Sequence, residues 1–146
     1  MDLNKQDINM LNNVYQNAEM GIKGTQLLVE KSDDPRFSQT LHRFLGEYAQ
    51  LKEQAATLLL EQGEQPRDSN LMESTGLWMG VQFNTLIDKT SSHMAEMLIQ
   101  GSAMGIVDNT KTLNTHQDIS PQAKKVAENL IRIEQDNIKA MKQYLN

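Results

Sequence analysis

Two long stretches with helical periodicity, joined by a very short connection, constrain this chain more than any other feature. In residues 4–31 and again in residues 35–62, apolar side chains recur at steps of three and four, which is the spacing of one face of an α-helix. Only Ser32, Asp33 and Asp34 stand between the two stretches. Long helices joined by so short a connection lie side by side in opposite directions. The sequence therefore predicts an antiparallel helical pair.

Residues suited to helix ends support these boundaries. Asn4, with Asp7 three positions later, forms an approximate capping box at the start of the first helix. Asp34 is a suitable N-cap for the second helix, and Pro35 suits its first turn, because an N–H there has no helical partner to lose. Gly63 can end this helix in the left-handed conformation. The predicted ends thus depend on local chemistry as well as on periodicity.

Three further helices are predicted after a polar, turn-like segment. Residues 91–113 and 120–145 are periodic, and the second of these begins with Ser120 as N-cap and Pro121 in the first turn. Residues 71–88 are apolar with helical spacing and predict a short crossover helix, since one unbroken helix over residues 71–116 would be about 69 Å long. The fold prediction is one all-α domain over residues 1–146. It is a four-helix bundle with an additional short crossover helix between the second and third bundle helices.

Composition excludes several classes of function. The net charge is −5, and the Lys and Arg residues are scattered, which disfavours a nucleic-acid binder. The absence of cysteine excludes disulfides and thiolate metal sites. The first residues lack the basic and apolar regions of a secretory signal, and no apolar run approaches the roughly 18 residues of a membrane-spanning helix. A cytoplasmic protein that binds neither nucleic acid nor membrane is therefore expected.

Three glutamates interrupt or border the apolar faces of different helices. Glu19, Glu47 and Glu134 all fall near mid-height of a bundle roughly 40 Å long. Carboxylates that meet at one level repel each other, so their pKa values rise unless a cation or hydrogen-bond donors intervene. Three interpretations follow: a metal centre, glutamates that reach solvent at the helix flanks, or a polar layer in which the glutamates are hydrogen-bonded by Gln50, Asn137, Tyr15 or Tyr48.

Several segments resemble a known family. "AEMGIKG", "DDPRF", "LLEQGEQP" and "EMLIQGSAMGI" are similar to small, functionally uncharacterised bacterial ferritin-like four-helix-bundle proteins. Metal sites of the ferritin-like superfamily take one Glu from each of two helices and a Glu-x-x-His pair from each of the other two. The resemblance makes Glu19 a single Glu, and it makes Glu47 with Gln50, and Glu134 with Asn137, the two pairs.

The chain departs from this metal-site pattern at three places. Both histidine positions are amides, which are weaker ligands for first-row metals than imidazole. The third bundle helix reads "GSAMG" at its middle, and Glu96 lies one to two turns too early. The resemblance therefore implies a degenerate, vestigial metal layer, with no bound cofactor expected. Its residues would be Glu19, Glu47, Gln50, Glu134 and Asn137. A working iron, manganese or zinc site is the alternative.

No catalytic arrangement is apparent in the sequence. The serines lack a neighbouring base and acid, and no Gly-rich loop has the Lys-Ser/Thr ending of a phosphate site. The leading hypothesis is a non-enzymatic bundle that acts by self-association, as a dimer, or through a protein partner. The competing hypothesis is an atypical metal-binding protein in metal handling or oxidative stress, by analogy with the family.

Glycines and methionines leave further alternatives open. "GLWMG" and "GSAMG" each place two glycines four apart on one side of a helix. Glycine inside a helix costs about 1 kcal/mol relative to alanine, so another helix should approach closely there. That helix would belong either to this chain or to a dimer partner. The methionines either fill the core or line an adaptable binding groove; they include Met79, Met94, Met97, Met104 and Met141, with Trp78 beside them.

Overall fold

The computed structural model describes residues 3–68 and 86–146, and this part of the chain forms four α-helices without any β-strand. The elements are α1 (Lys5–Lys31), α2 (Pro35–Glu61), α4 (Ser91–Thr115), α5 (Pro121–Met141) and a final 3-10 turn, η1 (Lys142–Tyr144). The described helices begin and end within two residues of the predicted bounds, except that the last turn of the helix predicted over residues 120–145 is 3-10 rather than α-helical. Most of the predicted crossover helix lies outside the described residues. Its predicted end is wrong, because residues 86–88 are not helical.

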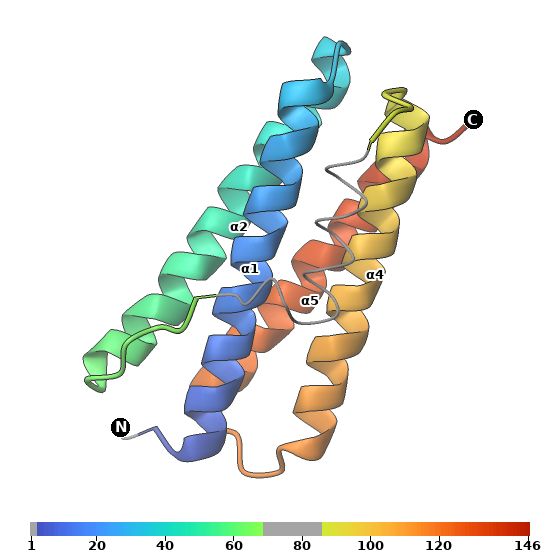
Figure 1. Cartoon of the computed structure of the whole chain (residues 1–146). Helices are drawn as coiled ribbons and strands as arrows, with labels where there is room; N and C mark the ends of the chain where they lie inside the picture. The colour runs from blue at the N-terminus through green and yellow to red at the C-terminus, as the bar shows by residue number, and fades with distance from the viewer. Residues whose placement is uncertain (1–2, 69–85) are drawn as a thin grey trace.

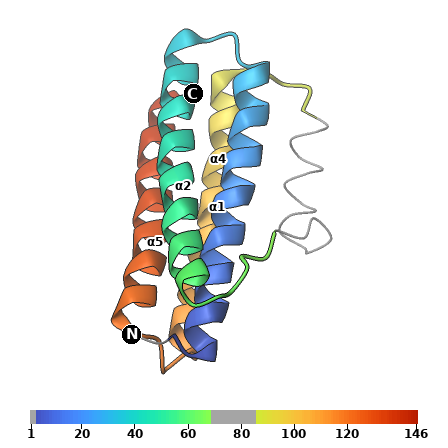
Figure 2. The same cartoon turned by 90° about the vertical axis from the view of Figure 1, so that its left-hand side faces the viewer.

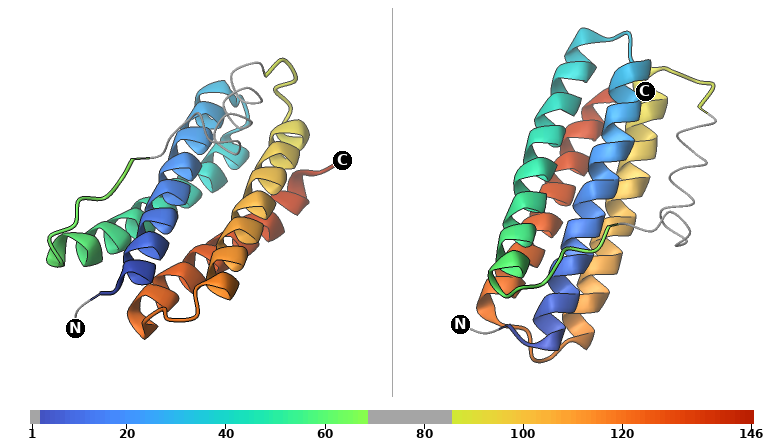
Figure 3. Two further views of the ribbon diagram at one scale, coloured as in Figure 1. Left: turned by 60° about the horizontal axis from the view of Figure 1, so that its bottom comes forward. Right: turned by 60° about the vertical axis from the view of Figure 1, so that its left-hand side comes forward.

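The helices form two antiparallel pairs. Helix α1 packs along α2, and α4 packs along α5, while α5 also contacts both α1 and α2 (Figure 1). Helix α2 ends at one end of the bundle and α4 begins at the other, so these two helices run in the same direction (Figure 2). The N-terminus and the C-terminus lie at opposite ends (Figures 2 and 3). None of the described helices combines the length and the apolar content needed to cross a membrane.

The predicted caps are confirmed and one of them links two helices. Asn4 Oδ1 accepts from the backbone N–H of Asp7 at 2.8 Å, and Asp7 Oδ2 accepts from the backbone N–H of Asn4 at 3.1 Å. The second carboxylate oxygen of Asp7 accepts from the backbone N–H of Ser120 at 2.7 Å, immediately before α5. Asp34 caps α2, and Gly63 adopts a φ of +75° after that helix. Asp7 thus fixes the starts of α1 and α5 together.

The core consists of the apolar faces predicted for the four helices. It contains the predicted stripe of α2, with Phe37, Leu41, Phe44, Tyr48, Leu51, Ala55 and Leu59 all buried. Met94, Met97 and Met141 are also buried, which confirms core filling as their role. Met104 is half-buried, and Trp78 and Met79 lie outside the described residues.

Asparagines join α1 to α4 on the polar side of the core. Asn13 donates to Asn109 Oδ1 at 3.2 Å, and one turn later Asn17 donates to Asp108 Oδ2 at 3.2 Å. One turn before Asn13 on α1, Asn9 Nδ2 lies 3.0 Å from His116 Nε2. The contact between α1 and α4 therefore includes a polar seam, which a search for apolar periodicity does not reveal.

Candidate functional site

Glu134 is the most deeply buried of the three predicted site carboxylates. Its side chain is only 4% exposed, and Gly105 of α4 faces it. A Cβ at position 105 would lie 2.9 Å from Glu134 Oε1, so glycine provides the room that this carboxylate needs. Burial raises the pKa of Glu134 to about 7, although hydrogen bonds from Tyr48 and Ser102 act in the opposite direction. Glu134 can therefore take up or release a proton near neutral pH.

Tyr48 of α2 connects Glu134 to Asn137. The Tyr48 hydroxyl donates to Glu134 Oε2 at 2.7 Å and accepts from Asn137 Nδ2 at 3.0 Å. Burial, and then the negative charge of Glu134, raise the pKa of Tyr48 well above its usual value, so the phenol stays protonated. Asn137 is 2% exposed, and its Oδ1 has no partner among the described residues. Tyr48 thus bonds Glu134 directly, while Asn137 joins this layer only through Tyr48.

Glu19 belongs to a different cluster, at the boundary between α1 and α2. It is 7% exposed, and its two carboxylate oxygens lie 3.7 Å from Lys23 Nζ and 3.4 Å from Lys52 Nζ. Lys52 also lies over the ring of Tyr15, 5.2 Å from its centroid. Two ammonium groups therefore balance the charge of Glu19, which favours a structural role for this carboxylate.

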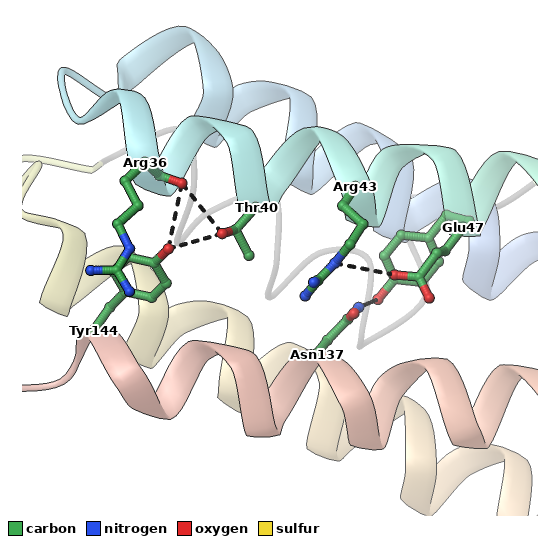
Figure 4. A network of polar contacts seen from close by, with 7 residues as sticks. Arg36, Thr40, Arg43, Glu47, Asn137 and Tyr144 are labelled. Carbon is green, nitrogen blue, oxygen red and sulfur yellow. Dashed lines mark hydrogen bonds and ion pairs between the residues drawn. The ribbon is translucent and has the colours of Figure 1, made fainter.

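Glu47 and Gln50 face away from the buried carboxylate. The side chain of Glu47 is 34% exposed and lies 4.0 Å from Arg43, one turn earlier on α2 (Figure 4). Partial burial raises the pKa of Glu47, while the charge of Arg43 lowers it. Gln50 is exposed and lines a surface groove between α2 and α5. In Figure 4, Asn137 points from α5 towards α2, whereas Arg36, Thr40 and Tyr144 make a separate group near the end of the bundle.

These positions do not provide the ligand set of a di-metal centre. Glu19 faces lysines, Glu47 faces Arg43, and Glu134 faces hydroxyl groups. Across residues 3–68 and 86–146, no three His, Asp or Glu side chains gather closely enough to hold a metal ion. At the two amide positions that replace histidine, Gln50 is exposed and Asn137 uses its NH₂ group on Tyr48. The residues present fit a hydrogen-bonded layer better than a metal site.

A small cavity beside Glu134 contains residues that the sequence did not single out as site residues. It lies between α1 and α4, and small side chains make most of its wall: Gly21, Gly24, Thr25, Gly101, Ser102 and Gly105. The Gly105 contact with Glu134 shows that this part of "GSAMG" packs inside the chain, while "GLWMG" lies outside the described residues. The sequence feature that could have indicated this cavity is the pairing of glycines along two helices. Gly21 and Gly24 of α1 and Gly101 and Gly105 of α4 line the cavity together.

A larger groove runs along the surface between α2 and α5. Its volume is about 560 Å³, and its lining is mostly amide and charged: Gln50, Glu53, Gln54, Thr57, Leu58, Gln122, Lys125, Val126 and Asn129. Glu53 lies on the α2 wall and Lys125 on the α5 wall. A smaller hollow between the same two helices repeats the pattern with Glu47 and Arg132. In both hollows an acidic side chain on α2 thus lies across from a basic one on α5.

Comparison with solved structures places the fold among helical bundles. No family model and no curated protein match the chain. A DUF305 fragment from Deinococcus radiodurans has a TM-score of 0.77 at 11% identity, with 98% of this chain and 97% of that one covered. The bacterioferritin-related protein from Bacteroides fragilis, described as a dodecameric thioferritin, has a TM-score of 0.73 at 10% identity, with 96% and 84% covered. YcfI from Rhodopseudomonas palustris, for which a structural role has been suggested, has a TM-score of 0.56 at 14% identity, with 97% and 95% covered. At such identities the likeness shows an all-α bundle of four helices and nothing about activity.

Proposed function

We propose that this chain is a non-enzymatic, ferritin-like bacterial bundle that acts in the cytoplasm through self-association or a protein partner. Its buried layer of Glu134, Tyr48 and Asn137 would be the remnant of a carboxylate centre. The observation that carries the proposal is the network itself. The buried carboxylate is bonded to a tyrosine hydroxyl at 2.7 Å, and within the described part of the chain it does not join further carboxylates or histidines in a metal-binding group. The bundle shape that the chain shares with a dodecameric thioferritin supports the assembly part of the proposal.

The groove between α2 and α5 is the surface that best suits a second copy of this chain. Its α2 wall carries Glu53 and Glu47, and its α5 wall carries Lys125 and Arg132. In a two-fold dimer each patch meets its own copy, so an acidic wall can face the basic wall of the other subunit. Leu58 and Val126 add apolar area within the same groove. The groove is thus self-complementary in charge.

Light scattering combined with size-exclusion chromatography tests the assembly. The proposal expects a dimer or a larger closed oligomer at micromolar concentrations, with a mass that falls on dilution. A monomer at every concentration up to about 1 mM would overturn self-association, since the dimer would then have a Kd above about 1 mM, which is too weak to be of biological use. Pull-down with the intact chain would then decide whether a different protein is the partner.

Metal analysis tests the vestigial character of the buried layer. Protein purified without an affinity tag or chelator should contain far less than one iron, manganese or zinc ion per chain by ICP-MS. The Glu134→Ala variant should give the same low value. Near-stoichiometric metal that disappears in the variant would overturn the vestigial reading and would favour the atypical metal protein.

A further inference from the structure

The cavity beside Glu134 has room for one water molecule or one ion of similar size. It leaves about 20 Å³ for the centre of a water-sized sphere, which is enough for a single water molecule or an ion of that size. Its walls come from α1 and α4, with Tyr48 of α2 and Glu134 of α5 completing them. Glycines at positions 21, 24, 101 and 105 keep this space open, because they have no side chains to fill it.

An unpartnered hydroxyl in the wall indicates that the cavity is occupied. Thr25 is 1% exposed, and its Oγ1 has no hydrogen-bond partner in the part of the chain that the structure describes. Buried polar atoms in folded proteins are nearly always bonded to protein, water or an ion. Because Thr25 lines the cavity, a particle in the cavity is within its reach.

The side chains that line the cavity favour a cation over a water molecule. Glu134 brings a carboxylate to the cavity, and the other side-chain oxygens of its described lining residues are the hydroxyls of Tyr48, Ser102 and Thr25 and the amide oxygen of Asn17. Among residues 3–68 and 86–146, those that line the cavity include no Lys, Arg or His to balance that carboxylate. A buried carboxylate without a nearby cation is strongly unfavourable unless it takes up a proton or a cation.

We propose that this cavity binds one water-sized monovalent cation, K⁺ or NH₄⁺, between the Glu134 carboxylate and the Thr25 hydroxyl. Both ions are close to water in size and accept a shell of neutral oxygens completed by a single carboxylate. A divalent ion fits less well, since Mg²⁺ needs near-ideal octahedral geometry and Ca²⁺ takes six to eight oxygen ligands, usually from several carboxylates. This site is independent of the proposed self-association, because it lies on the opposite side of the core from the groove between α2 and α5.

Thermal unfolding in matched salts tests the site. The Tm is measured by circular dichroism at pH 8, where Glu134 is ionised, in KCl, NH₄Cl or tetramethylammonium chloride at equal ionic strength. Tetramethylammonium is too large for the cavity and therefore serves as the reference. At about ten times its Kd, a bound cation should raise the Tm by roughly 3–6 °C over the reference. Equal Tm values in all three salts would overturn the proposal and would leave water as the only occupant.

Variants of Glu134 and Thr25 test whether the cation that raises the Tm binds in this cavity. Glu134→Gln removes the charge and Thr25→Val removes the hydroxyl, each with little change in size, so both should abolish the difference between salts. Thr110→Val, at an exposed position of α4 outside both the cavity and the groove, should retain it. A salt difference that survives in Glu134→Gln would place the cation elsewhere and would overturn the assignment.

A direct readout covers the case in which a core variant fails to fold. In ¹⁵NH₄Cl, the ammonium protons of the wild-type chain should show a nuclear Overhauser effect to the Thr25 methyl group. Adding KCl should remove this signal by competition, whereas tetramethylammonium chloride should not. Absence of the signal at saturating ammonium would contradict binding at this cavity.

Discussion

The single residue with the largest expected effect on pH dependence is Glu134. Its pKa rises from the usual 4.5 to about 7 in the folded chain, and its neighbours Tyr48 and Ser102 are neutral. Between these two pH values the folded state keeps a proton that the unfolded state has lost. The free energy of unfolding therefore falls as pH rises through this window, by roughly 3 kcal/mol in total for this group, and is flat for it on either side.

Glu134→Gln should remove this contribution. In urea unfolding at pH 5, 6, 7 and 8, in buffer without K⁺ or NH₄⁺, the wild-type chain should lose stability towards pH 8, and the variant should lose about 3 kcal/mol less. Glu128→Gln changes an exposed glutamate of the same helix and serves as the control, which should follow the wild type. If Glu134→Gln shows the same slope as the control, Glu134 does not titrate in this range.

The hydroxyl of Tyr48 supports two buried groups at once. Tyr48→Phe leaves Asn137 Nδ2 without its acceptor and Glu134 without its 2.7 Å donor, so we expect a loss of about 1–3 kcal/mol in the free energy of unfolding. The pKa of Glu134 should rise further, because the lost hydrogen bond favoured its charged form. Tyr15→Phe, at a half-buried tyrosine whose ring lies under Lys52, should cost much less. Urea unfolding at pH 8 compares the two, and equal losses would contradict a special role for Tyr48.

At the scale of the helices, two glycines predict opposite effects of the same substitution. A Cβ at Gly21 of α1 would lie 2.7–2.8 Å from three ring atoms of Tyr48, whose hydroxyl is fixed by hydrogen bonds. Gly21→Ala should therefore lower the free energy of unfolding by about 1–3 kcal/mol. Gly46 of α2 has nothing within 4 Å of its Cβ position, so Gly46→Ala should raise it by about 0.5–1 kcal/mol. Thermal or urea unfolding distinguishes the signs, and a stabilising Gly21→Ala would show that α1 and α2 can separate freely.

The helices could be predicted from the sequence because their signals are local. The Asn4–Asp7 capping box, the Asp34 cap and Gly63 all act within one turn of chain, and each is found where it was expected. Local signals of this kind could not predict whether each glutamate side chain points into the core or towards solvent. Glu19, Glu47 and Glu134 all border an apolar stripe, and only the packing of neighbouring helices decides which of them is enclosed. Gly105 makes room for Glu134, whereas Glu19 lies beside two lysines and Glu47 beside Arg43.

Long-range polar contacts were also beyond prediction from periodicity. The asparagine seam between α1 and α4 and the second contact of Asp7 join residues roughly a hundred positions apart. Polar residues beside a stripe look the same in sequence whether they face water or another helix. The serine of "GSAMG" illustrates this, because Ser102 was considered only as a nucleophile and is instead a buried neighbour of Glu134.

At the scale of the whole molecule, the groove between α2 and α5 gives the most direct test of assembly. If two copies meet there with the acidic wall of one against the basic wall of the other, reversing one wall creates repulsion at two symmetric places. Glu53→Lys and Lys125→Glu should therefore each weaken the dimer, about tenfold or more in Kd. The double variant exchanges the walls and should restore association, because opposite charges meet again.

Sedimentation equilibrium gives the dimer Kd of the wild type, the two single variants and the double variant under the same conditions. Glu30→Lys, at an exposed position of α1 away from the groove, changes net charge by the same amount as Glu53→Lys and should associate like the wild type. The double variant has the net charge of the wild type, so its rescue alone does not exclude an effect of net charge. The Glu30→Lys control makes that distinction, because it changes the net charge outside the groove. A dimer that is insensitive to both single reversals would place the interface on another face of the bundle.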